Sequence, residues 1–196
     1  MLQQLTKIFG SRTKALEILY LLNDTKPVVR QGFYTNELSE VEKFCQEQSL
    51  FIKKSPLTIT LEEKESFSNR GKITEKSDPQ GMIFVYISKN EEKALLTCLY
   101  ETKQDHYTTG IMLGYPECCA RFFEREFEKW NLNPMHTPIN IWTNLTQRDE
   151  DCVLISHFPC NSECKESIEI GNANLKLIET IDKKSADKIR TQLRVM

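Results

Sequence analysis

The stretch Met82-Ile83-Phe84-Val85-Tyr86-Ile87 carries the clearest strand signal in the chain, because apolar, β-branched and aromatic residues follow one another without a break. Such a run is typical of a central strand that is buried on both faces. Asn90 comes shortly after it and can cap a helix over residues 90–100, with Leu95, Leu96 and Leu99 facing inward. A buried strand that leads directly into a helix indicates a core built from both element types.

The sequence before this strand contains a second strand signal and a polar interruption. Residues 57–61 alternate Leu or Ile with Thr, as a half-buried strand does. The stretch 62–81 is mostly polar, with a possible short strand at Ile73-Thr74, and is the best candidate for a domain boundary. We therefore predict an N-terminal segment over residues 1–62 and a second domain over residues 67–196.

Helix signals occupy most of the remaining sequence, where apolar residues recur at helical spacing. Together with the strand signals they predict an α+β fold: a small mixed sheet covered by helices, after a short helical N-terminal segment. The helix signals lie at residues 2–9, 13–22, 39–48, 116–130, 161–181 and 185–195.

Composition and charge narrow the class of protein. The chain has 196 residues, the size of one domain or of one domain with a small appendage. Its net charge of −2 gives no reason to expect binding to nucleic acid or to an anionic membrane. No apolar run approaches the roughly 20 residues that cross a bilayer. We predict a cytoplasmic protein without a membrane or nucleic-acid partner, and the sequence leaves small-molecule and protein partners open.

Cysteine stands out, with seven residues in the chain. Thiols remain reduced in the cytoplasm, and an odd number cannot all pair within one chain. Cys45 and Cys98 lie on apolar faces of predicted helices, and Cys152 begins a predicted strand over residues 152–156, so we interpret these three as packing residues. The other four cysteines lie in two short motifs.

The first motif is Leu-Gly-Tyr-Pro-Glu-Cys-Cys at residues 113–119. Gly114 can turn the chain, and Pro116 suits the first turn of a helix because its missing N–H would have no partner there. Cys118 and Cys119 then lie in that first turn, where a helix N-terminus favours the thiolate form. Both metal binding and nucleophilic chemistry use the thiolate.

The second motif is Ser-His-Phe-Pro-Cys-Asn-Ser-Glu-Cys at residues 156–164. Its proline again predicts the start of a helix. If the helix begins there, Cys160 and Cys164 lie one turn apart on the same face. His157 precedes them in the entering loop, so two thiols and an imidazole would converge.

The two motifs together predict a shared metal site. Thiolate-rich sites select zinc, copper(I) or iron–sulfur clusters over hard cations. Adjacent helical residues point about 100° apart. We therefore expect only one of the adjacent pair to bind a single zinc ion, whereas a cluster of several irons accepts a looser arrangement. The candidate ligands are Cys118, Cys119, His157, Cys160 and Cys164.

The pair of motifs resembles an uncharacterised, largely archaeal and bacterial protein family of unknown function. Its members combine a Leu-Gly-Tyr-Pro-x-Cys-Cys segment with a downstream His-x-Pro-Cys-x₃-Cys segment, and both are present here. The resemblance covers about residues 67–181, and the stretch 1–60 looks like an addition. It implies that the same five Cys and His residues form the site, and it implies no particular reaction.

Two alternatives to a metal site stay open at the level of sequence. The first is a thiol-based enzyme or redox protein, in which Cys118 or Cys119 is a nucleophile or forms a disulfide and His157 is the base. The second is a non-catalytic interaction module with inert, buried cysteines. The sequence has no phosphate-binding glycine loop and no nucleophile elbow. His106, His136, Arg121 and Arg125 are interpreted as solvated residues.

Overall fold

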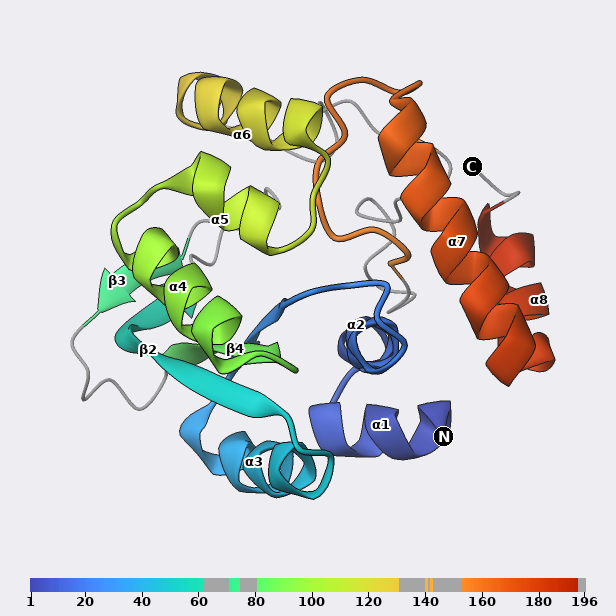
Figure 1. Cartoon of the computed structure of the whole chain (residues 1–196), viewed down its shortest axis with the longest axis horizontal. Helices are drawn as coiled ribbons and strands as arrows, with labels where there is room; N and C mark the ends of the chain where they lie inside the picture. The colour runs from blue at the N-terminus through green and yellow to red at the C-terminus, as the bar shows by residue number, and fades with distance from the viewer. Residues whose placement is uncertain (62–70, 75–80, 131–139, 141, 143–152, 194–196) are drawn as a thin grey trace. The chain divides into compact units, whose positions relative to one another are not determined.

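The computed structural model describes residues 1–61, 71–74, 81–130, 140, 142 and 153–193. Within these ranges the chain contains eight α-helices and a four-stranded sheet, which confirms the predicted α+β class. The chain divides into two compact units, and Figure 1 labels the helices and strands that belong to them. One comprises residues 1–25 and 115–196, and the other comprises residues 26–114.

These units differ from the predicted segments, residues 1–62 and 67–196, because strands on either side of the polar stretch 62–81 pair in one sheet. The stretch 1–25 belongs instead with the C-terminal part of the chain.

The unit of residues 26–114 is built on the sheet, in the order β1-β4-β2-β3. The predicted central strand is confirmed, because β4 pairs with both β1 and β2. The expectation of a mixed sheet is wrong, since each of the three strand pairs is antiparallel. β4 lies between β1 and β2 and runs opposite to both, so β1 and β2, which share a direction, are not neighbours in the sheet. The strands are β1 (Val29–Phe33), β2 (Phe51–Leu61), β3 (Gly71–Thr74) and β4 (Met82–Ser88).

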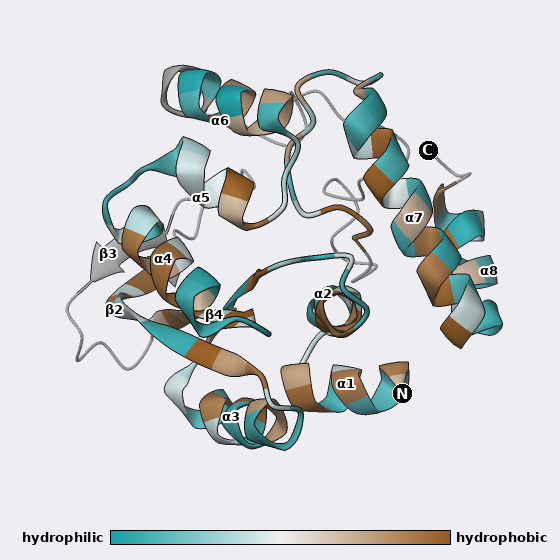
Figure 2. Cartoon of the chain, viewed as in Figure 1, coloured by the Kyte–Doolittle hydropathy of each residue, from teal (hydrophilic) through white to brown (hydrophobic). Residues whose placement is uncertain are grey.

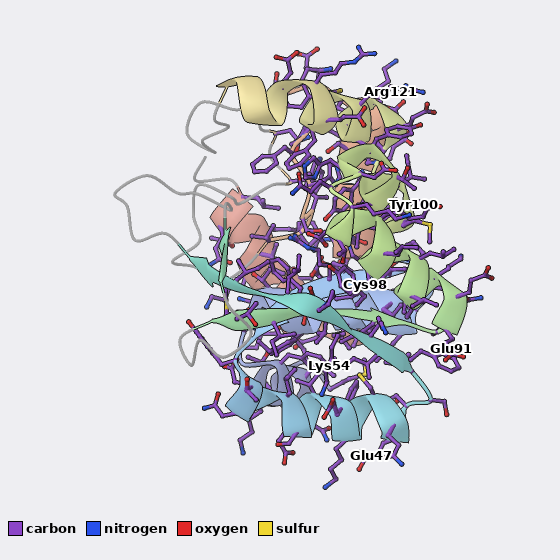
Figure 3. The ribbon with its side chains drawn as sticks, turned by 90° about the vertical axis from the view of Figure 1, so that its left-hand side faces the viewer. Glu47, Lys54, Glu91, Cys98, Tyr100 and Arg121 are labelled. Carbon is purple, nitrogen blue, oxygen red and sulfur yellow. The ribbon has the colours of Figure 1, made fainter. Side chains whose placement is uncertain are left out.

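Two helices cover opposite faces of this sheet, with α3 (Leu38–Glu47) on one side and α4 (Glu91–Thr102) on the other (Figure 3). On the α4 side the Tyr86 hydroxyl donates to Glu101 at 2.7 Å. Arg30 of β1 reaches the same carboxylate at 2.5 Å. Strand residues two apart share a face, so the alternation along β4 sends Val85 and Ile87 to the α3 side.

A local capping signal sets the start of α4. The Asn90 side chain accepts the N–H of Lys93 at 2.9 Å and caps α4, as predicted. Leu95 and Leu99 are 48% and 42% exposed, so the predicted inward direction of these two side chains is wrong. The buried face of α4 carries the smaller Ala94, Thr97 and Cys98. The structure adds a 3-10 turn at Thr35–Glu37 and the helix α5 (His106–Met112), which the sequence patterns did not predict.

Gly114 ends this unit in a conformation that only glycine adopts easily. Its φ is +79°, in the left-handed region. A Cβ atom at this position would lie 2.7 Å from the Pro27 ring. Gly114 therefore turns the chain at the start of the first cysteine motif, as the sequence predicted.

The other unit is helical in its described part. Its short N-terminal helices confirm the predicted helical start, and the Ser11 side chain caps α2 through the N–H of Lys14. Residues 15–21 of α2 are all buried, and Figure 2 shows brown, apolar residues on this helix. No described helix of the chain combines the length and the apolarity that a membrane crossing needs. The helices are α1 (Leu2–Phe9), α2 (Arg12–Leu22), α6 (Glu117–Trp130), α7 (Lys165–Ile181) and α8 (Lys183–Leu193).

Candidate metal centre

The first cysteine pair lies in the first turn of α6, as the proline-led motif predicts. The Pro116 carbonyl accepts the N–H of Cys119 at 3.0 Å and that of Ala120 at 2.9 Å. Proline thus begins the helix without losing a hydrogen bond. Phe123, one turn further along α6, stacks on Phe158 of the loop that carries the second motif, with 5.9 Å between ring centroids. This packing holds the start of α6 against that loop.

The second motif enters its helix later than predicted. α7 begins at Lys165 with Cys164 as its N-cap, so residues 160–164 form a turn and not the first turn of the helix. The Asn161 side chain accepts the N–H of Glu163 at 2.9 Å, and the Asn161 carbonyl accepts the N–H of Cys164 at 3.3 Å. When a side chain forms a hydrogen bond with the backbone two residues later, the chain favours a turn over a helix. The turn, and not helical spacing, brings the two cysteines together.

Four sulfur atoms meet between these two helix starts. The Sγ of Cys118 lies 3.8 Å from that of Cys119 and 3.7 Å from that of Cys164. The Sγ atoms of Cys119 and Cys164 are 3.6 Å apart. Cys160 completes the group, and all four sulfurs lie within 4.8 Å of one another.

These distances fit a single tetrahedral metal ion. Zinc–thiolate bonds of about 2.3 Å in a tetrahedron place neighbouring sulfurs about 3.8 Å apart. The three contacts among Cys118, Cys119 and Cys164, at 3.8, 3.7 and 3.6 Å, match that edge closely. The four cysteines therefore lie at metal-binding distance from one another without any rearrangement of the backbone.

Both members of the adjacent pair join the cluster, which differs from the expectation that only one would. The two Cα–Cβ bonds diverge around the helix axis, but rotation about χ1 turns the two sulfurs back toward each other. The Cys119 sulfur also accepts the backbone N–H of Cys160 at 3.3 Å. That bond links the start of α6 directly to the turn of the second motif.

His157 takes a different position from the one predicted, because its ring does not belong to the metal-binding group. Its Nε2 lies 2.9 Å from the Ser167 hydroxyl, and both side chains are buried. Asn140 donates to the same hydroxyl at 3.4 Å, and the Tyr115 ring lies 5.2 Å from the imidazole. His157 therefore packs the loop against the first turn of α7, behind the cysteine turn.

Burial favours the neutral form of the thiols in the absence of a cation. Burial, followed by the neighbouring Cys164 and Cys160 side chains, raises the pKa of Cys118 to about 12. Burial also raises the pKa of Cys119, although the N–H of Cys160 acts in the opposite direction. A thiolate in this group would face other sulfurs without a counter-charge. A bound cation would supply that charge and displace the protons.

Two polar side chains at the cluster were not predicted. A carboxylate oxygen of Glu166 accepts from the Cys164 thiol at 3.6 Å and lies 4.0 Å from the Cys118 sulfur. The side-chain amide of Asn161 donates to the Cys160 sulfur at 3.4 Å. Both residues lie within two positions of a motif cysteine, but their identity alone does not show that they turn toward sulfur.

The cysteines outside the cluster were expected to be packing residues. The six described cysteines are free, and Cys45 and Cys98 are buried, as expected for packing residues. The Cys98 thiol donates to the Lys54 carbonyl at 3.7 Å, between α4 and β2 (Figure 3). No strand forms over residues 153–156, because the loop bonds to side chains: Val153 N–H donates to Thr13.

Arg121, Arg125 and His106 do not join the cluster. Arg121 is exposed on α6 and pairs with Glu117 at 2.6 Å, and Arg125 is exposed on the same helix. His106 is the first residue of α5 and is half-buried, not in a loop. Cys152 and His136 lie outside the described residues.

Comparisons with protein-family models, curated proteins and solved structures find no match for this chain. The resemblance to the family with the two cysteine motifs therefore stays a prediction.

Proposed function

We propose that the four cysteines bind one tetrahedral metal ion, with zinc as the expected ion, and that the ion joins the starts of α6 and α7. The observation that carries the proposal is the set of sulfur–sulfur distances, 3.6–3.8 Å for three pairs and no more than 4.8 Å for any pair. An all-thiolate set of ligands without an open position is typical of a structural zinc site.

A single ion explains these distances better than an iron–sulfur cluster does. A cluster places its own irons and sulfides between the cysteine ligands, so the thiolate sulfurs stand farther apart than in van der Waals contact. Here the sulfurs of Cys118, Cys119 and Cys164 are close enough to share one ion. An iron–sulfur cluster is therefore the alternative outcome of the metal analysis.

The geometry favours a metal site over the thiol enzyme. A nucleophilic thiol needs a lowered pKa or an adjacent base, but burial raises the pKa of Cys118 and of Cys119. The predicted base, His157, lies against Ser167 instead of a cysteine. A cation that replaces four thiol protons suits this environment better than a free thiolate.

Metal analysis of the full chain, purified without oxygen and without added chelator, tests the proposal. We expect one zinc per chain in the wild type and in Cys98→Ala, whose sulfur lies outside the cluster. Cys119→Ser should retain little metal. Cobalt(II) titrated into the zinc-free chain should give thiolate-to-cobalt absorption that saturates at one equivalent. A wild-type chain that binds no metal would exclude the proposal. A chain that contains iron and inorganic sulfide would show that the four cysteines hold an iron–sulfur cluster and not a zinc ion.

A further inference from the structure

The four sulfurs differ in how open they are to solvent. Cys119 is 1% exposed and Cys164 is 3% exposed, so a reagent cannot approach either sulfur without local opening. Cys118 and Cys160 are half-buried. An external molecule can therefore reach the cluster through only these two cysteines, one from each motif.

The two accessible sulfurs differ in their hydrogen bonds. The Cys160 sulfur accepts an N–H bond from the side chain of Asn161 at 3.4 Å. Among the described residues, no N–H group donates to the Cys118 sulfur, whose neighbours are other cysteines and the Glu166 carboxylate. An N–H donor holds part of the charge of a thiolate and weakens it as a nucleophile.

Glu166 strengthens this difference. An ionised carboxylate only accepts hydrogen bonds, so it cannot stabilise a thiolate as an amide does. Its oxygen lies 4.0 Å from the Cys118 sulfur, and two negative charges at that distance repel each other. In the metal-bound centre, solvent can reach the thiolates of Cys118 and Cys160, and the charge on Cys118 is therefore the less stabilised of these two.

We propose that Cys118 is the modification site of this metal centre, where a small, soft electrophile such as an alkylating agent reacts first. The inference rests on the proposed function, because the metal ion keeps the sulfur as a thiolate. In the reaction the Cys118 sulfur forms a bond to carbon while the bond between carbon and the leaving group breaks. The leaving group departs with that electron pair, no proton moves, and the thioether product carries one negative charge less.

The test uses limiting iodoacetamide on the zinc-loaded full chain, with peptide mass spectrometry at short times and a colorimetric reporter for released zinc. We expect carbamidomethylation of Cys118 at least about fivefold faster than of Cys160, the ratio that corresponds to one ordinary hydrogen bond. Cys45 and Cys98 should stay unmodified because both are buried. Zinc release should follow the modification of Cys118.

Two conservative variants exchange the hydrogen bonds on which the inference depends. Glu166→Gln replaces an acceptor with an amide that can donate to Cys118, and should slow modification of that sulfur about fivefold. Asn161→Asp keeps the oxygen that holds the turn and removes the donor to Cys160, so Cys160 should react faster. Both side chains are exposed, so neither change disturbs the core.

The zinc content of the same samples separates the two possible failures. A chain that binds one zinc but reacts equally fast or faster at Cys160 would overturn the assignment of Cys118 and leave the metal site intact. Unchanged rates in both variants would overturn it too. A chain that binds no zinc would overturn the proposed function and this inference with it.

Discussion

Replacing Cys164 with serine should affect stability in opposite directions with and without zinc. Cys164 is the N-cap residue of α7, and its side chain makes no capping hydrogen bond. Serine is among the preferred N-cap residues because its hydroxyl accepts an N–H of the first turn. In EDTA we therefore expect the free energy of unfolding of Cys164→Ser to be unchanged or to rise by up to about 1 kcal/mol.

Zinc should reverse this order. A ligand that binds only the folded chain stabilises it by about 4 kcal/mol at a concentration 1,000 times its dissociation constant. For a chain of this length, about 4 kcal/mol corresponds to a rise in melting temperature of about 8–16 °C. The variant retains three of the four clustered sulfurs, and it should lose most of this rise because the hydroxyl is a poor zinc ligand.

Thermal unfolding in zinc buffered at a fixed free concentration, and in EDTA, measures both effects. Cys98→Ala is the matched control, because its sulfur is buried but lies outside the cluster. The control should lose stability in both buffers and keep the full zinc-dependent rise. An equal zinc-dependent rise in Cys164→Ser and the wild type would refute the argument that this sulfur is a ligand.

Three further predictions concern the buried polar groups. His157→Ala should lower the free energy of unfolding by about 1–3 kcal/mol, since it leaves a buried hydroxyl without its imidazole partner, yet one zinc should still bind by metal analysis. Burial raises the pKa of Cys45 from its usual value near 9 to about 12, so the folded chain holds this proton more tightly than the unfolded chain. The contribution of Cys45 to stability should be constant below pH 9 and fall above it by up to about 1.4 kcal/mol per pH unit, so urea unfolding of Cys45→Ala should show a smaller slope above pH 9. Tyr86→Phe should cost about 1–3 kcal/mol in the same assay, because it removes a buried hydroxyl from the Glu101 carboxylate, and an unchanged midpoint would contradict this.

Sequence alone identified the features that depend on neighbours in the chain. The run at residues 82–87 predicts β4 because continuous burial demands continuous apolar character, and β4 is paired on both sides. Asn90 predicts the start of α4 because a cap bonds to an N–H only three residues away. The predicted mixed sheet was wrong, since strand direction depends on the connections and leaves no trace in hydrophobic periodicity.

The strand β1 shows what local patterns miss. Its sequence Val-Arg-Gln-Gly-Phe has an arginine and a glycine among five residues, so no strand was predicted there. The arginine is accommodated because it forms a 2.5 Å ion pair with Glu101. Glu101 belongs to α4 and lies about 70 residues later in the chain. The missing side chain of Gly32 leaves room for the Phe84 ring across the pair, 3.3 Å from where a Cβ atom would stand. Both reasons are tertiary contacts.

The cysteine site divides in the same way. Residue type and short spacing are local properties, and they singled out four cysteines and His157 as candidate ligands and predicted a proline-led helix for the first pair. Tertiary packing brings both Cys118 and Cys119 into the group, turns His157 to Ser167 and places Glu166 beside the sulfurs. Side-chain rotamers and the packing of segments far apart in the chain set these distances, and spacing along the sequence does not encode them.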